Sequence, residues 1–382
     1  MDMERFDYVD ETLGLHEMNK HLQKSRRVSV DLEADSYHHY GEKICLIQIA
    51  TDRRIFVIDP LKVDLTFMAS LLEDDSKEKV FHDGDYDGRM FLTYLGVKPS
   101  PIFDTMIAAR VLGKEKVGLA NLLSDYFQVD LDKKWQKADW SRRPLKEEMQ
   151  QYAAMDVAYL LPLRDRMAAD MEKMGRMAWA CEEFSRLLDN LDALPERRAS
   201  FTRVKGARNL SPRHLAVLQQ LLEWREDKAR ALDVPSFKIV GSERLLKLAA
   251  THPRSLKEAE ESGILSPRQA SLFGGDIMRA IRMGMKVPRA KLPGFPEPAR
   301  HRRDYSVEKV IRCFKKIRDT RAEELGLDPG FLMPNAVLKA VARIKPVSLN
   351  EIDKSGLLKS WQLEVMGDSL AGCLRKEEKS RS

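Results

Sequence analysis

The second half of the chain contains an internal repeat that aligns without gaps. When this half is shifted by 93 positions, identical residues coincide, among them Arg225 with Arg318 and Pro253 with Pro346. So many identities at one offset, over roughly 40 positions, indicate two copies of one small domain. Apolar residues recur at helical spacing within residues 211–233, which predicts that the repeated unit is all-helical. We expect the two helical domains at residues 207–285 and 304–378.

The first half of the chain has a different pattern. Val-rich or β-branched stretches predict strands, and the short polar segment Thr51–Arg54 between two of them predicts a hairpin. Strands mixed with helices are typical of an α/β domain with a mixed sheet, which we expect over residues 1–204. The expected strands are residues 28–33, 44–50, 55–58 and 80–81, and the expected helices are residues 65–73, 86–96, 102–113, 118–127 and 145–159.

Residues 286–303 contain four prolines and an excess of basic residues, a composition that predicts a semi-rigid linker between the two copies. No apolar run approaches the about 18–20 residues of a membrane span. The acidic first residues lack the basic-then-apolar order of a signal peptide, so we expect a cytoplasmic protein.

Charge is divided unevenly along the chain. Residues 201–382 hold 36 Lys and Arg against 22 Asp and Glu, whereas residues 1–200 hold 29 against 37. A basic half attracts a polyanion by releasing its counterions, and an acidic half can gather carboxylates around cations. Ordinary solvated surface charge explains the same asymmetry equally well.

The four cysteines are far apart and form no C-x-x-C pair. We therefore expect Cys45, Cys181, Cys313 and Cys373 to be free thiols rather than disulfide partners or zinc ligands. Any metal in this protein should then be bound by oxygen atoms.

Two pairs of polar residues have spacings that bring their side chains together. Asp31 and Glu33 are two apart in a predicted strand, so they point to the same face. Tyr152 and Asp156 are four apart in a predicted helix that is otherwise apolar, and they also share a face. A buried pair of carboxylates is tolerable if a cation lies between them, although a solvent-facing strand edge is an alternative.

The segment F-H-D-G-D-Y-D-G-R-M-F, residues 81–91, adds more carboxylates where a short strand leads into a helix. We expect Asp83 and Asp85 to cap the helix, which leaves Asp87, one turn in, for another role. Hard oxygen ligands suit Mg²⁺ or Mn²⁺, and two such ions can clamp the attacking and leaving oxygens of a phosphoryl displacement. A nearby tyrosine can position the attacking water or help to deprotonate it.

Three motifs resemble the DEDD exonucleases of the type with Tyr in the last motif: D-L-E at 31–33, H-x-x-x-x-D from His82 to Asp87, and Y-A-A-M-D at 152–156. Further segments resemble the ribonuclease D family within that group, and the C-terminal repeat is similar to the HRDC domain. These segments are C-L-I-Q-I-A (45–50), F-D-T-M-I-A-A (103–109) and L-D-K-K-W…D-W-S-R-R-P-L (131–145). The chain departs from the pattern at Leu32, where many members have Thr, and at Asp83-Gly84, where some relatives have Asn.

The resemblance implies an RNase H-like mixed sheet and a 3′→5′ exoribonuclease that releases nucleoside 5′-monophosphates. Its cofactor would be two divalent ions, Mg²⁺ or Mn²⁺, and its partner RNA, with precursor tRNA 3′ ends as one substrate class. No membrane and no obligate protein partner are expected. By the same resemblance, Asp31, Glu33 and Asp156 hold the first ion, Asp31 also reaches the second, Asp87 holds the second, and Tyr152 orients the water.

Several assignments stay open. His82 either contacts the terminal nucleotide or is a hydrogen-bonded residue at a strand end. Arg142 and Arg143 either contact phosphate or are solvated loop charges, and Trp135 and Trp140 either stack on bases or pack. A DNA exonuclease and a non-catalytic nucleic-acid-binding protein are the alternative functions, whereas the absence of a G-x-x-x-x-G-K-[ST] loop argues against a helicase.

Overall fold

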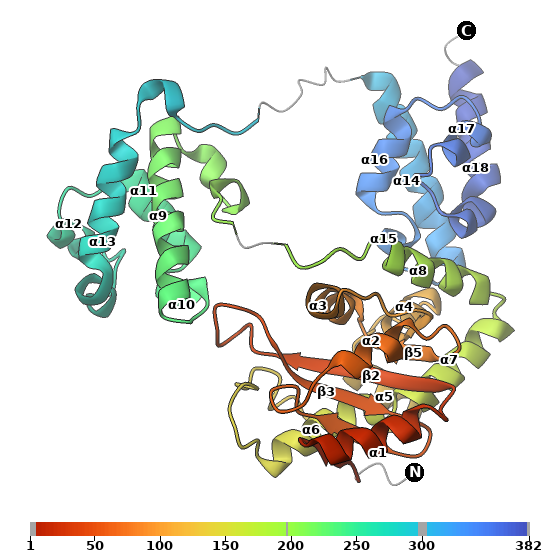
Figure 1. Ribbon diagram of the computed structural model, residues 1–382. Helices are drawn as coiled ribbons and strands as arrows, with labels where there is room; N and C mark the ends of the chain where they lie inside the picture. Colours follow the sequence, from red (N-terminus) through yellow and green to blue (C-terminus); the bar gives the residue numbers. More distant parts are fainter. Residues whose placement is uncertain (1–4, 196–197, 297–303, 380–382) are drawn as a thin grey trace.

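A computed structural model describes residues 5–195, 198–296 and 304–379 (Figure 1). A six-stranded sheet with the order β1-β4-β3-β2-β5-β6 forms the centre of the first half of the chain. The pairs β2/β3 and β3/β4 are antiparallel, and the other three pairs are parallel. The sheet is therefore mixed, as predicted. Its strands are β1 (Asp7–Val9), β2 (Arg27–Ala34), β3 (Ile44–Ala50), β4 (Ile55–Ile58), β5 (Glu78–Phe81) and β6 (Ile102–Asp104).

Helices cover this sheet. All seven residues of β3 are buried, which requires that both faces of the sheet centre be covered. Helix α6 contacts β2, β3 and β4, and α7 contacts β5 and β2. The helices of this half are α1 (Thr12–Leu22), α2 (Thr66–Glu73), α3 (Asp85–Leu95), α4 (Thr105–Val111), α5 (Leu119–Phe127), α6 (Glu147–Ala158), α7 (Leu160–Lys173) and α8 (Met177–Asp189).

The predicted strands, the hairpin and most of the helices are confirmed, with one wrong boundary. Residues 102–104 form a strand rather than the start of a helix, because the Asp104 side chain accepts the backbone N–H groups of Met106 and Ile107 and so starts α4 at Thr105. Strand β1 and helices α1, α7 and α8 were not predicted. Pro162 lies in the first turn of α7, where proline is tolerated.

The two copies of the repeat have the same helices in the same order, and each helix of the second copy begins 93 residues after its counterpart. A hydrogen-bond pattern repeats as well. Arg225 donates to the carbonyl of Val240 and to the Ser242 hydroxyl, and Arg318 donates to Met333 and Asn335 at the equivalent positions. The repeat is confirmed. Its helices are α9 (Pro212–Ala231), α10 (Ser236–Ile239), α11 (Ser242–Thr251), α12 (Leu256–Glu261) and α13 (Pro267–Lys286), then α14 (Tyr305–Leu325), α15 (Pro329–Leu332), α16 (Asn335–Arg343), α17 (Leu349–Lys354) and α18 (Ser360–Lys379).

The second helical domain (α14–α18) packs on the first half of the chain through α8 (Figure 1). Its core residues join one hydrophobic cluster with the sheet, whereas those of the first helical domain (α9–α13) form a separate cluster. The Trp361 ring stacks on Trp179 at 5.1 Å between centroids, and its indole N–H donates to Glu183 at 2.8 Å. The Glu182 carboxylate accepts the first backbone N–H groups of α18, which caps this helix from outside its own domain.

The prediction that all four cysteines are free is wrong for two of them. Cys313 in α14 and Cys373 in α18 form a disulfide, while Cys45 and Cys181 are free. The bond joins the first and last helices of the second helical domain, which pack side by side although their cysteines are 60 residues apart. Sequence spacing alone does not reveal such a pairing. Within the described ranges, no helix is both long and apolar enough to cross a membrane. The basic run at residues 300–303 lies outside the described residues.

Candidate active site

The central strand β2 carries the first carboxylate pair. Asp31 and Glu33 point to the same face, the one on which α6 lies. Asp31 pairs with Gln48 of β3, so the Gln48 side chain shares that face. Gln48 is fully buried, and neither polar atom of its amide has a hydrogen-bond partner among the described protein atoms. A buried amide without a hydrogen-bond partner is costly, and Gln48 lies directly beside Asp31 on the neighbouring strand. Sequence reasoning gave this residue no role.

Helices α6 and α3 bring the remaining predicted residues to the same place. One carboxylate oxygen each from Asp31, Glu33 and Asp156 lie within 4.8 Å of one another. Asp87, in the first turn of α3, lies outside this tightest group but close enough for its charge to raise the pKa of Glu33. Tyr152 lies one turn before Asp156 on α6 and lines the same cavity.

The electrostatics of the cluster follow from burial and mutual repulsion. Burial raises the pKa of Asp31 to about 7. Burial, and then the neighbouring carboxylates, also raise the pKa of Glu33, Asp87 and Asp156 well above the ordinary range. The pKa of Tyr152 is raised by burial and by the charge of Asp156, so its phenol stays protonated and acts through its hydroxyl as a hydrogen-bonding group.

No Lys or Arg in the described parts of the chain forms an ion pair with these four carboxylates. Buried carboxylates without a cationic partner are strongly disfavoured, and a divalent cation bound by oxygen ligands supplies the missing charge. The donor set therefore fits a divalent metal ion such as Mg²⁺ or Mn²⁺. The expectation of oxygen ligands also agrees with the cysteines, since none belongs to the cluster.

Asp31, Glu33 and Asp156 line a cavity of about 440 Å³, a size typical of small-ligand sites. His82 lines it as well. Its Nδ1 lies 2.9 Å from the Thr105 hydroxyl, which itself donates to the Phe81 carbonyl, so Nδ1 is the protonated nitrogen and Nε2 an acceptor. Burial lowers the pKa of His82 to about 4, with a smaller effect of Arg110, so the ring is neutral at physiological pH.

The two predicted phosphate-binding arginines do not line this cavity. All five N–H groups of Arg143 donate within the protein, to both carboxylate oxygens of Asp59 and to three backbone carbonyls. These contacts occupy every donor of Arg143, which argues against the predicted phosphate contact and also against a solvated loop charge. Arg142 is exposed and bonded to Asp139, and its phosphate contact stays a prediction. Trp140 is buried, which favours packing.

A loop and a helix start contribute polar groups that sequence reasoning did not identify. Asn121 lies in the first turn of α5, and Lys133 and Gln136 lie between α5 and α6; all three line the cavity. The resemblance of residues 131–145 to a known family indicated that this segment contributes to function. Only the fold shows which of its residues line the same cavity as the carboxylates.

Comparison with known proteins agrees with this geometry. The family model described as 3'-5' exonuclease matches residues 6–172, and the HRDC domain model matches residues 214–281 and 308–374. The ribonuclease D of Musicola paradisiaca is 31% identical over 364 residues, which cover 94% of this chain and 96% of that protein. The ribonuclease D of Granulibacter bethesdensis is 30% identical over 355 residues, 92% of this chain and 88% of that one.

Solved structures give the same result. The crystal structure of Escherichia coli RNase D has a TM-score of 0.73 and 25% identity, and the match covers 97% of this chain and 99% of that one. The catalytic core of RRP6 from Trypanosoma brucei has a TM-score of 0.65 and 26% identity, over 74% of this chain and 80% of that one. Near full-length similarity to ribonucleases D, the two HRDC matches and the carboxylate cluster place the chain in the ribonuclease D family of DEDD 3′→5′ exoribonucleases.

Proposed function

We propose that this exoribonuclease trims the 3′ ends of precursor tRNA and other structured RNAs, releases nucleoside 5′-monophosphates, and does so with two divalent ions, Mg²⁺ or Mn²⁺. The observation that carries the metal assignment is the buried carboxylate cluster, three of whose oxygens lie within 4.8 Å and which no Lys or Arg of the described chain neutralises. The E. coli relative is described as an exoribonuclease involved in structured RNA processing, which supports the substrate class.

Asp31, Glu33 and Asp156 would hold one ion, and Asp31 and Asp87 the other, because these residues converge from β2, α6 and α3. Bound divalent ions activate water and stabilise the charge that develops on the scissile phosphate. Tyr152 stays protonated beside the cluster, so its hydroxyl orients the attacking water rather than removing a proton.

His82 is suited to recognise the end of the RNA. Its Nε2 is a hydrogen-bond acceptor, because Nδ1–H is used by Thr105. An acceptor on a neutral ring pairs with a ribose hydroxyl and repels a phosphate. We assign His82 to the terminal ribose, which favours a free 3′ hydroxyl over a 3′ phosphate.

A larger groove of about 1210 Å³ suits the RNA that precedes the terminal nucleotide. Helix α4 contributes to both cavities: Met106 lines the carboxylate cavity and Arg110, one turn on, lines the groove. The Arg110 guanidinium is exposed, and in the described ranges it forms no ion pair with a carboxylate. We assign Arg110 to a phosphate of the RNA strand.

The test uses the full chain and a 3′-extended tRNA. With Mg²⁺ or Mn²⁺ the extension should shorten from its 3′ end and release 5′-mononucleotides, EDTA should stop the reaction, and a 3′-terminal phosphate should slow it. The variant Asp31→Asn should bind the RNA but not cleave it. A matched DNA oligonucleotide tests the alternative substrate.

Two results would contradict the proposal. Full turnover by protein freed of metal would exclude the ion-dependent site, and cleavage of circular RNA would exclude exonucleolytic attack. Arg110→Gln should raise KM for RNA longer than a few nucleotides and leave cleavage of a dinucleotide unchanged. Arg53→Gln is the control, because Arg53 is exposed in the turn between β3 and β4 and lines neither cavity.

A further inference from the structure

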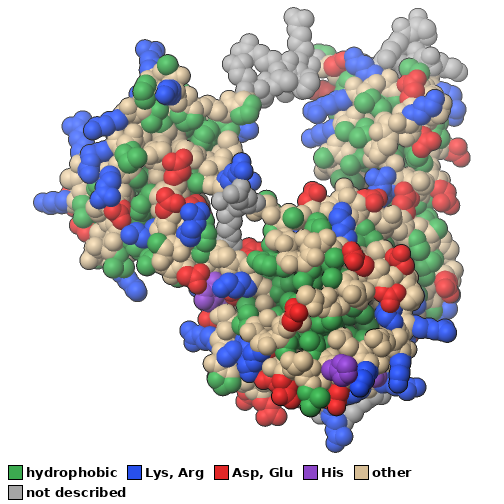
Figure 2. Space-filling view, in the orientation of Figure 1, with side chains coloured by type: hydrophobic (Ala, Val, Ile, Leu, Met, Phe, Trp, Pro, Cys, Tyr) green, Lys and Arg blue, Asp and Glu red, His purple; other side chains and the backbone are tan. Residues whose placement is uncertain are grey.

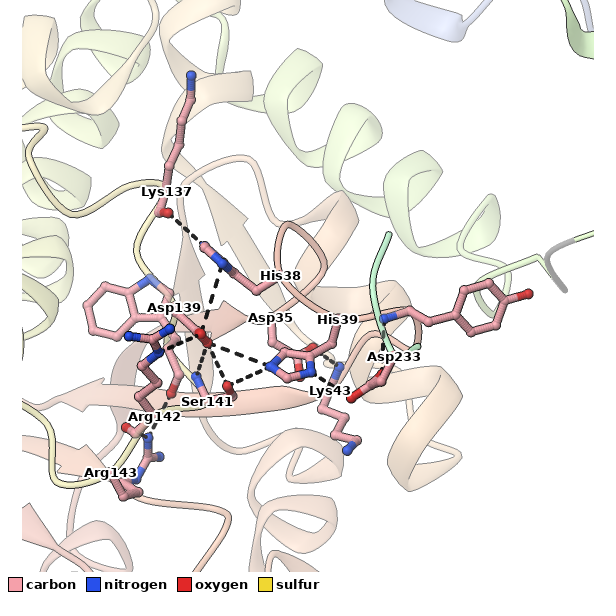
Figure 3. A network of polar contacts seen from close by, with 12 residues as sticks. Asp35, His38, His39, Lys43, Lys137, Asp139, Ser141, Arg142, Arg143 and Asp233 are labelled. Atoms are coloured by element: carbon pink, nitrogen blue, oxygen red, sulfur yellow. Dashed lines mark hydrogen bonds and ion pairs between the residues drawn. The ribbon is translucent and has the colours of Figure 1, made fainter. Parts of the chain in front are cut away.

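The turn between β2 and β3, residues 35–43, connects the nuclease half to the first helical domain (Figure 3). Asp233 follows α9 in that domain. Its carboxylate lies 2.7 Å from His39 Nδ1 and accepts the Tyr40 backbone N–H at 3.2 Å. The Tyr37 and Phe237 rings add a contact at 5.4 Å between centroids. This turn is therefore one place where the first helical domain is attached.

The same turn also contacts the loop between α5 and α6, which lines the active-site cavity. His39 Nε2 lies 2.9 Å from the Ser141 hydroxyl, and His38 Nε2 lies 2.9 Å from the Lys137 carbonyl. Residues 131–136, earlier in this loop, contribute Lys133 to the metal cavity. His39 thus contacts the first helical domain with one ring nitrogen and the active-site loop with the other.

Counting hydrogens assigns the donor in each of these bonds. The Ser141 hydroxyl has one hydrogen and lies 2.6 Å from an oxygen of Asp139, so it donates to that carboxylate. It must then accept from His39 Nε2. The Asp233 carboxylate accepts from His39 Nδ1, because an ionised carboxylate has no hydrogen to donate.

We propose that His39, which donates from both ring nitrogens, is a positioning residue that holds the first helical domain against the nuclease half for cleavage of structured RNA. Loss of the ring removes the hydrogen bond to Asp233 of the first helical domain and the hydrogen bond to Ser141 of the active-site loop, so the contact between the two parts weakens.

The role in cleavage rests on the proposed function, in which the first helical domain binds structured RNA. The experiment compares KM for a hairpin RNA with a 3′ tail and KM for a short single strand at neutral pH. In His39→Gln the ratio of these KM values should be about 3- to 10-fold higher than in the wild type, with kcat on the short strand unchanged.

A second measurement tests the attachment without RNA. Small-angle X-ray scattering of the full chain should show a larger radius of gyration for His39→Gln than for the wild type. His16→Gln is the control, because His16 is exposed on α1 and far in sequence from the turn.

Identical scattering from all samples would overturn the proposed contact. If the scattering changes as expected but the KM ratio does not, the contact is real and its role in RNA cleavage is overturned. Loss of cleavage of both RNAs by the wild type would instead refute the proposed function of the metal site, so the two failures are distinguishable.

Discussion

At the scale of single residues, the active site works against the stability of the fold. Three carboxylate oxygens lie within 4.8 Å of one another, and burial raises the pKa of Asp31 to about 7. Charges gathered in this way destabilise a protein that lacks their counter-ion. The uncompensated negative charge that would attract metal ions to this site therefore lowers the free energy of unfolding.

Tyr152 offers the sharpest test of a single role. Because its phenol stays protonated, Tyr152→Phe removes a hydrogen-bond donor without removing a base. We expect kcat to fall by about 10²–10⁴, with RNA affinity and melting temperature nearly unchanged. Steady-state kinetics on a short single strand measure this, and a wild-type kcat would show that the ring only packs against Trp140, whose ring lies 6.1 Å away.

His82 gives a dependence of stability on pH. Burial lowers the pKa of His82 to about 4, below its unfolded value of about 6.5. Between these pH values the unfolded chain binds more protons, so the wild type should lose stability as pH falls from 6.5 to 4. Compared with His82→Asn, the loss should be about 1–3 kcal/mol in urea unfolding. Equal pH slopes for the two proteins would contradict the assignment of a neutral, buried ring.

The sequence predicted the cluster of carboxylates because the periods of strands and helices determine which side chains share a face. Asp31 with Glu33, and Tyr152 with Asp156, needed only the local periods of two and of about four residues. Lys133 and Arg143 could not be assigned in this way, because loops have no period. Arg143 looked like Arg142 in the sequence, and only the fold placed one beside Asp59 and left the other exposed.

At the scale of elements, the Arg143–Asp59 pair fixes the loop before α6 to the end of β4. Asp59 is fully buried and also accepts from the Tyr8 hydroxyl at 2.9 Å. Burial alone would raise the pKa of Asp59, but Arg143 and Tyr8 hold it below its usual value. The loop before α6, which lines the carboxylate cavity, is therefore anchored by the Arg143–Asp59 ion pair.

Removal of this anchor should be costly. Arg143→Met leaves a buried carboxylate without its partner, so the free energy of unfolding should fall by about 3–5 kcal/mol. Arg142→Met, the matched control at an exposed site, should change it by no more than about 0.5 kcal/mol. Urea unfolding at neutral pH measures both, and similar values for the two variants would show that the ion pair contributes little.

Element boundaries were harder to predict than elements. The apolar stretch at 102–113 contains a short strand and then a helix, and the change occurs at the Asp104 cap. Strand β1 has only three residues and pairs only with β4, so its local sequence signal is weak. By contrast, the ungapped repeat predicted two helical domains, whose helices follow one another at a constant offset.

At the scale of the whole molecule, the two copies of the repeat have different surroundings and different charge. Residues 207–303 hold 19 Lys and Arg against 10 Asp and Glu, whereas residues 304–378 hold 13 against 12. Lys and Arg side chains gather on the outer edge of the first helical domain (Figure 2). The second copy packs on α8. The basic charge expected to attract RNA therefore belongs mainly to the first copy and the linker.

Because the second copy packs on α8, a truncation that tests RNA binding by the basic first copy must leave the second copy in place. Deletion of residues 207–382 would expose the Trp179 surface of α8, so it tests folding as well as RNA binding. Replacement of residues 198–303 by a Gly/Ser linker keeps the second copy in place. This variant should retain kcat on a short strand, raise KM for structured RNA, and flatten the salt dependence by about 0.7–0.9 per lost phosphate contact. Equal salt slopes for the two proteins would show that the first copy does not carry the RNA.

The shared hydrophobic cluster has a consequence for how the molecule melts. Because the sheet and the second helical domain form one core, joined across α8 by Trp361 and by the Glu182 cap of α18, neither should lose its packing alone. The first helical domain has its own core. Calorimetry should therefore resolve two transitions, one for residues 207–285 and one for all the rest. The chain contains three successive domains but would unfold in two steps. The first half of the chain and the second helical domain, which are far apart in sequence, would melt together, and the first helical domain between them would melt separately.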